Sequence, residues 1–103
     1  MRAAASEPTL SFEFYPPKDD EGTEKLWRTF DHLLEARPDY VSVTYGAGGS
    51  NRDKSFAIVE RMAPLVLTIG HLTAVGASRE STREIIQRYR SCGVNTILAL
   101  RGD

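Results

Sequence analysis

Four short runs of strand-forming residues alternate along this chain with three stretches of helical periodicity, and this order limits the possible folds more than any other feature. The first run, Leu10 to Tyr15, alternates apolar and polar residues and stops at two prolines. The other runs are Tyr40 to Tyr45, Leu65 to Val75 and Asn95 to Leu100. Short runs of this kind, bounded by turn-forming residues, are typical of β-strands.

The stretches between these runs carry apolar residues at the spacing of an amphipathic helix. We expect Thr23 to cap the first helix, Ser81 and Glu84 to form a capping box in the third, and Gly93 to follow its end. Pro64 is expected to end the second helix. The apolar stripes are Leu26, Trp27, Phe30, Leu33 and Leu34 in the first helix, Phe56, Val59 and Met62 in the second, and Ile85, Ile86, Tyr89 and Cys92 in the third.

Strands that alternate with helices at this spacing predict an α/β fold built of parallel βαβ units. A parallel pair needs a crossover of about a dozen residues, and a helix supplies it. A (β/α)₈ barrel needs about 250 residues. If the fold is such a TIM barrel, this chain of 103 residues holds its first four strands and three helices. Residues 1–9 would be an N-terminal tail, residues 10–103 the partial barrel, and the remainder would be missing after residue 103.

The composition excludes several classes of protein. Hydrophobic residues make up 41% of the chain, which is too many for a disordered protein. Lys and Arg total 13 against 14 Asp and Glu, so no net charge favours binding to nucleic acid or to an anionic membrane. A single cysteine, Cys92, cannot form an intramolecular disulfide. With no signal peptide or apolar run of about 18 residues, we expect a soluble, cytoplasmic protein without a metal site.

Glu13 is the first candidate site residue, because ligands of α/β proteins bind at the carboxyl ends of the strands. It lies between Phe12 and Phe14. If the two rings face the covering helices, the carboxylate points to the opposite face, which in a barrel is the lumen. A buried carboxylate without a partner suits a general acid near neutral pH. The alternative is a glutamate at the rim that pairs with a lysine or an arginine.

Three further features stand at strand ends. Gly46 to Ser50 form a glycine-rich loop before a helix, where backbone N–H groups can bind an anion. Asn51 replaces the third glycine of a dinucleotide motif, so a tight turn and a ligand contact both remain open. His71 has no second metal ligand nearby, which favours a hydrogen-bonded site histidine or a core histidine. Asp103 is a candidate acid.

Taken together, the segments around these strand ends resemble the methylenetetrahydrofolate reductase family. The resemblance covers nearly the whole chain from Leu10 onward, and four motifs in one order are far more specific than any one alone. The family consists of flavin-containing (β/α)₈ barrels, so the resemblance implies the N-terminal part of such a barrel. The motifs are SFEFYPPK at residues 11–18, PDYVSVTYGAGGSNRD at 38–53, HLTAVG at 71–76 and GVNTILALRGD at 93–103.

The resemblance implies an oxidoreductase that reduces 5,10-methylenetetrahydrofolate to 5-methyltetrahydrofolate in one-carbon and methionine metabolism. FAD would be the cofactor, NADH or NADPH the source of hydride, and the full-length protein a homo-oligomer. By matching motif positions, Glu13 would be the general acid that helps to open the five-membered ring of the folate. Asp103 would face both the flavin and the pterin ring of the substrate. The other flavin contacts would be Thr44, Tyr45, Ala47, His71, Arg101 and Gly102.

The sequence departs from the family pattern at three positions without losing a proposed functional group. Tyr15 stands where phenylalanine is usual, Asn51 where threonine is common, and Ala74 where cysteine is common. A non-catalytic module that binds flavin or folate is the alternative to an enzyme. We expect the 103-residue chain alone to show little or no reductase activity, because half of the site would be missing.

Overall fold

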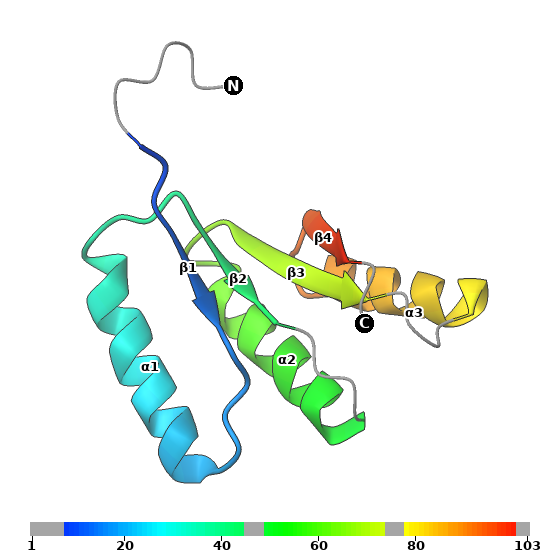
Figure 1. Ribbon diagram of the computed structural model, residues 1–103, viewed down its shortest axis with the longest axis horizontal. Helices are drawn as coiled ribbons and strands as arrows, with labels where there is room; N and C mark the ends of the chain where they lie inside the picture. Colours follow the sequence, from blue (N-terminus) through cyan, green and yellow to red (C-terminus); the bar gives the residue numbers. More distant parts are fainter. Residues whose placement is uncertain (1–7, 45–48, 74–77, 101–103) are drawn as a thin grey trace.

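A computed structural model describes residues 8–44, 49–73 and 78–100 of the chain, and of residues 49–52 it describes the backbone alone. Strands and helices alternate throughout, in the order predicted from the sequence (Figure 1). The elements are β1 (Ser11–Phe14), α1 (Asp20–Leu34), β2 (Tyr40–Val43), α2 (Gly49–Met62), β3 (Thr68–Thr73), α3 (Arg79–Ser91) and β4 (Thr96–Leu100).

The four strands form one sheet in the order β1-β2-β3-β4, and every neighbouring pair is parallel. This arrangement confirms the predicted α/β class. Each strand pairs with the strand that follows it in the chain, so the order does not reverse among these strands. Doubly wound sheets reverse their strand order at the ligand site, whereas barrels keep it consecutive.

The two faces of the sheet differ in character. The register places Phe14 beside Val43 and Val43 beside Gly70, and both apolar side chains are buried in the core. Side chains alternate along a strand, so Glu13, Ser42 and Ile69 share the opposite face, which we call the open face. A hollow of about 330 Å³ lies on the open face. Its lining residues are Ser11, Glu13, Tyr40, Ser42, Ile69, Thr96, Ile97 and Leu98.

The core lies between the sheet and the three helices. Phe30 of α1 packs edge-on against Phe14 of β1, with ring centroids 5.9 Å apart. Met62 of α2 is fully buried, and Cys92 is half-buried against the core, as their helical spacing predicted. The helices therefore pack on the core face of the sheet, and the open face stays available for other groups.

The starts of two helices differ from the prediction. Asp19, not Thr23, is the N-cap of α1, and its Oδ1 accepts a hydrogen bond of 2.8 Å from the Gly22 amide. A carboxylate in extended backbone accepts such a bond readily, so the polar turn before Thr23 becomes the first turn of the helix. The capping box of α3 is formed by Ser78 and Ser81, three residues earlier than expected.

Backbone conformation and backbone hydrogen bonds explain the end of α3 and the start of β3. Gly93 adopts a positive φ of 92° after the C-cap of α3, as predicted for a residue that glycine tolerates best. The third strand is shorter than the predicted run. The amides of Leu65 and Val66 both bond to the carbonyl of Met62, so the run begins as a turn that continues from α2. β3 therefore starts only at Thr68.

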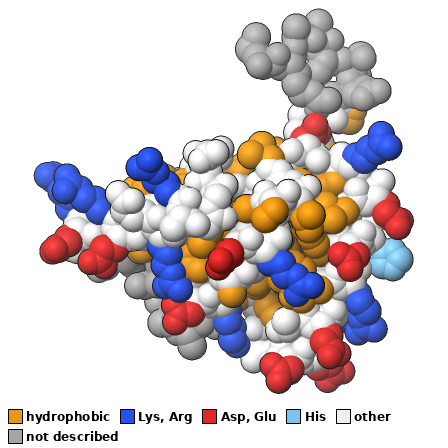
Figure 2. Space-filling model, turned by 180° about the vertical axis from the view of Figure 1, so that it is seen from behind, with side chains coloured by type: hydrophobic (Ala, Val, Ile, Leu, Met, Phe, Trp, Pro, Cys, Tyr) orange, Lys and Arg blue, Asp and Glu red, His pale blue; other side chains and the backbone are white. Residues whose placement is uncertain are grey.

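Figure 2 shows the molecule from behind the view of Figure 1. Hydrophobic side chains are exposed in the middle of this surface, and acidic and basic side chains are interspersed around them. No helix among the described residues is both long and apolar enough to cross a membrane.

Candidate active site

Glu13 stands near the carboxyl end of β1, and its side chain lies on the open face. Phe14, the next residue, is buried in the core, whereas Glu13 lines the hollow on the other side. The alternation predicted from the two phenylalanines is therefore confirmed for the carboxylate. The Glu13 side chain is 45% exposed, which corrects the expectation that it would be buried.

Two side chains approach the Glu13 carboxylate, one at each oxygen. The Tyr15 hydroxyl donates a hydrogen bond of 2.8 Å to Oε2. The His71 Nε2 lies 3.6 Å from Oε1. Glu13 is thus neither a carboxylate without partners nor a rim glutamate paired with a lysine or arginine among the described residues. Strand pairing explains the arrangement, because β1 and β3 flank β2 in one sheet and their carboxyl ends lie at the same edge.

The backbone of His71 is anchored by a hydrogen bond from α3. It is 5% exposed, and its carbonyl accepts a hydrogen bond of 2.7 Å from the buried hydroxyl of Tyr89 on α3. Its Nε2 is buried and makes no hydrogen bond within the described part of the chain. The separation of 3.6 Å from Glu13 exceeds a normal N–H···O distance. Buried nitrogen atoms normally have a hydrogen-bond partner, and a bound ligand can supply one at this position.

Thr44 follows the end of β2 and is fixed through its backbone. Its amide donates to the Phe14 carbonyl at 3.0 Å, and its carbonyl accepts a bond of 2.9 Å from the hydroxyl of Ser55 on α2. These bonds join the ends of β1 and β2 to the helix that covers them. Thr44 and His71 therefore both stand at the carboxyl ends of neighbouring strands, as the strand pattern predicted.

The contact with Glu13 changes the pKa of Tyr15. The Glu13 carboxylate raises the pKa of the Tyr15 phenol, first through the hydrogen bond and then through its negative charge. The phenol is therefore protonated throughout the neutral range and is available as a donor. In the sequence, Tyr15 stands out only as a departure from the family motif and is not a predicted site residue. Its position two residues after Glu13, on the same side of an extended segment, could have identified it.

Five of the predicted site residues lie outside the described residues. Among the residues that are described, no group of three His, Cys, Asp or Glu side chains could hold a metal ion. The five residues are Tyr45, Ala47, Arg101, Gly102 and Asp103.

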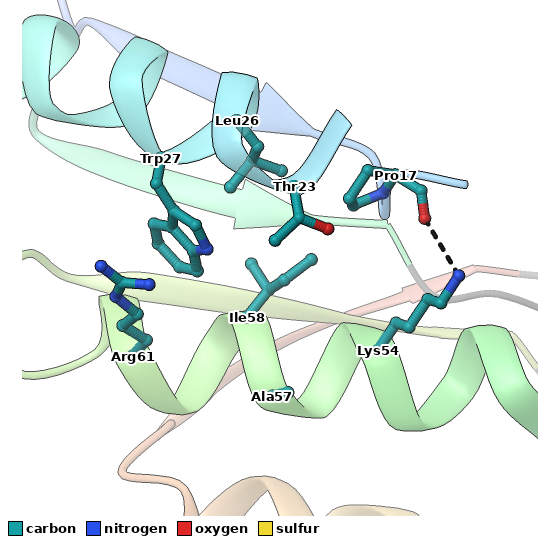
Figure 3. A pocket seen from close by; sticks show the side chains of 8 residues that line it. All are labelled: Pro17, Thr23, Leu26, Trp27, Lys54, Ala57, Ile58 and Arg61. Atoms are coloured by element: carbon teal, nitrogen blue, oxygen red, sulfur yellow. Dashed lines mark hydrogen bonds between the residues drawn. The ribbon is translucent and has the colours of Figure 1, made fainter. Parts of the chain in front are cut away.

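A second hollow, of about 270 Å³, lies between α1 and α2 (Figure 3). Leu26, Trp27 and Ile58 form much of its lining, and the Arg61 guanidinium lies 4.1 Å from the centre of the Trp27 ring. None of the lining residues that the structure describes is an acid or a thiol. At its end Lys54 donates to the carbonyls of Pro17 and Lys18, each at 3.3 Å. These two bonds anchor the segment that follows the Glu13 strand.

Comparison with known proteins matches the whole chain, residues 1–103, to the family model described as methylenetetrahydrofolate reductase. A 5,10-methylenetetrahydrofolate reductase of Pectobacterium carotovorum is 43% identical over 91% of this chain and 32% of its own length. The protein of the same description from Escherichia coli is 38% identical over the same shares.

A plant relative, methylenetetrahydrofolate reductase (NADH) 1 of Arabidopsis thaliana, is also 38% identical over 91% of this chain, which covers 16% of the plant protein. The chain thus spans about a third of the length of its bacterial relatives and less of the plant protein. The match extends across every described strand and helix. The chain belongs to the methylenetetrahydrofolate reductase family.

Proposed function

We propose that this chain forms part of an enzyme that reduces 5,10-methylenetetrahydrofolate to 5-methyltetrahydrofolate. The observation that carries the proposal is the Glu13 carboxylate, which lies on the open face near a strand end with His71 and Tyr15 at its two oxygens. A proton donor at this position suits a reaction that opens a ring at a C–N bond. The reaction belongs to one-carbon and methionine metabolism.

The fold proposed for the whole protein is a (β/α)₈ TIM barrel, of which the chain supplies four strands and three helices. Two features support this proposal. The strand order is consecutive, and the hydrophobic core formed by the described residues lies on one face of the sheet. In a closed barrel the open face becomes the lumen, and the strand ends that carry Glu13 and His71 become its functional mouth.

FAD is the proposed cofactor, and the described residues fit it at two positions. His71 offers a buried nitrogen without a partner among the described residues, and Thr44 stands at the end of the neighbouring strand. The chemistry that FAD supplies when bound is transfer of hydride from NADH or NADPH to the folate. The other proposed contacts, from family resemblance, are Tyr45, Ala47, Arg101, Gly102 and Asp103, with Asp103 also facing the pterin ring.

Glu13 is the proposed general acid. As the C–N bond of the five-membered ring breaks, its electron pair stays on nitrogen and takes a proton from the Glu13 carboxyl group. The carbon is left as an iminium that then accepts hydride. The carboxylate that remains lies beside this cation and stabilises it. The 45% exposure of the side chain lets the carboxyl group regain its proton from solvent.

The test is Glu13→Gln in a protein that carries this sequence at the full length of the bacterial relatives. We expect folate reduction to fall by at least ~100-fold, the low end of a general acid's contribution, while FAD stays bound. Reduction of the flavin by NAD(P)H should survive, because that step needs no proton from Glu13. Glu24→Gln on the exposed surface of α1 is the matched control and should leave both steps unchanged.

Equal loss of both half-reactions in Glu13→Gln would mean a structural role for this residue. A full-length protein that binds flavin or folate but reduces no folate would instead support the non-catalytic binding module. For the 103-residue chain alone we propose little or no reductase activity. We further propose a cytoplasmic location and a homo-oligomer for the full-length protein, with the folate and the nicotinamide dinucleotide as its small-molecule partners.

A further inference from the structure

We propose that Tyr15 is a positioning residue for the general acid, and that its hydrogen bond to Glu13 strengthens as the proton leaves the carboxyl group. The inference rests on the proposed function. It starts from one contact, the 2.8 Å bond from the Tyr15 hydroxyl to Glu13 Oε2. A phenylalanine at this position would have no hydroxyl and could not make this bond.

Tyr15 is held in place by the chain around it. It precedes Pro16, and a residue before proline is confined to extended backbone. Extended backbone places Tyr15 and Glu13 on the same side of the chain. The following segment is anchored by Lys54 of α2, which donates to the carbonyl of Pro17 (Figure 3) and to that of Lys18. The hydroxyl is therefore directed at the carboxyl group before any substrate binds.

The two oxygens of Glu13 then have different roles. Oε2 accepts from Tyr15, so in the protonated acid Oε2 is the carbonyl oxygen and the transferable proton is on Oε1. Oε1 is the oxygen 3.6 Å from the buried His71 Nε2. Tyr15 thus orients the proton away from itself and toward the side of the carboxyl group that His71 approaches. His71 and Tyr15 are the titratable groups that approach the carboxylate among the described residues.

The hydrogen bond from Tyr15 to Glu13 also stabilises the transition state more than the ground state. A hydrogen bond to an ionised carboxylate is shorter and stronger than one to a neutral carboxyl group. The Tyr15 bond therefore gains strength while Glu13 gives up its proton. An interaction that is stronger in the transition state raises kcat and leaves the binding of the substrate nearly unchanged.

The test is Tyr15→Phe in the full-length protein, which removes one oxygen atom from a side chain that is 66% exposed. We expect kcat for folate reduction to fall about 3- to 10-fold, the difference between a charged and a neutral hydrogen bond. The KM for the folate should stay within about twofold, and reduction of the flavin by NAD(P)H should be unchanged. Glu24→Gln, on the exposed surface of α1, is the control and should change none of the three.

Two results overturn the inference. If kcat in Tyr15→Phe equals that of the unmodified protein, the hydrogen bond has no role in proton transfer. If KM and flavin reduction change together with kcat, Tyr15 supports the structure only. A full-length protein that reduces its flavin but reduces no folate at all refutes the proposed function instead, and this inference with it.

A titration of the full-length protein tests the contact without any turnover. The pKa of the Tyr15 phenol is raised by Glu13, so Glu13→Gln should shift the tyrosinate absorbance of one tyrosine to lower pH. Tyr15→Phe identifies that signal by removing it. If Glu13→Gln leaves every tyrosine titration unchanged, the bond is absent and the inference fails.

Discussion

The hydroxyl of Tyr89 on α3 donates a hydrogen bond of 2.7 Å to the carbonyl of His71 on β3, across the interface between helix and sheet. The tyrosine ring is fully buried and lies against Gly70, the neighbour of His71 in the strand. α3 therefore holds the strand that carries the site histidine from the face opposite the site. Stability and site geometry are coupled through this one side chain.

Tyr89→Phe tests the bond itself. Removing the hydroxyl should lower the free energy of unfolding by about 1 kcal/mol, the usual net value of an intramolecular hydrogen bond. Urea unfolding followed by circular dichroism measures the change. Tyr40→Phe is the control, because the Tyr40 hydroxyl makes no hydrogen bond within the described part of the chain. Equal losses in the two variants would show that the Tyr89 bond contributes nothing specific.

Gly70→Ala tests the close packing of the strand on the tyrosine ring. A Cβ at this position would lie 2.4 Å from Cε1 of Tyr89, so the strand or the ring must move. We expect a loss of about 1–3 kcal/mol in the free energy of unfolding, as for other overpacked cores. Combining Gly70→Ala with Tyr89→Leu should cost less than the sum of the two single changes, because leucine vacates the space. If the loss in the double variant equals the sum of the two single losses, Gly70→Ala does not clash with the Tyr89 ring.

The start of α1 gives a third prediction. Asp19→Ala should lower the free energy of unfolding by about 1 kcal/mol, because it leaves the Gly22 amide without its acceptor. Thr23→Ala should cost less, because the Thr23 hydroxyl bonds only to a carbonyl inside the first turn. Thermal unfolding of both variants, compared at one pH, checks the order. A larger loss in Thr23→Ala would restore Thr23 as the residue that controls the helix start.

Cys92 should react slowly with alkylating reagents. Burial, and then the charge of Glu60, raise the pKa of its thiol, so little thiolate is present at about pH 8. Glu60→Gln removes one cause and should speed alkylation of the folded chain by iodoacetamide. An unchanged rate would mean that access to the sulfur, not its charge, limits the reaction.

The raised pKa of the Cys92 thiol also determines how the stability of the chain changes with pH. The folded chain holds the thiol proton more tightly than the unfolded chain does. The stability linked to Cys92 is therefore fully present below the ordinary thiol pKa and is lost as pH rises through the raised value. Comparison of urea midpoints at neutral and alkaline pH with those of Cys92→Ala isolates this contribution.

The α/β class, the order of the elements and the side of the strand on which Glu13 lies could all be predicted from the sequence. These properties depend on periodicity, which is local. The two phenylalanines around Glu13 define the alternation of side chains that is typical of a half-buried strand. Proline and glycine mark the ends of several elements. The motif resemblance also gave the family, which the match over residues 1–103 confirms.

The tertiary structure decided which groups surround the carboxylate. His71 reaches Glu13 because β1 and β3 both pair with β2, and no local pattern states which strands become neighbours. The exposure of Glu13 and its bond to Tyr15 depend on side-chain conformations that periodicity does not specify. The helix starts differed for a related reason. Several polar residues could serve as caps, and the N-cap is the one whose backbone is extended when the helix packs on the sheet.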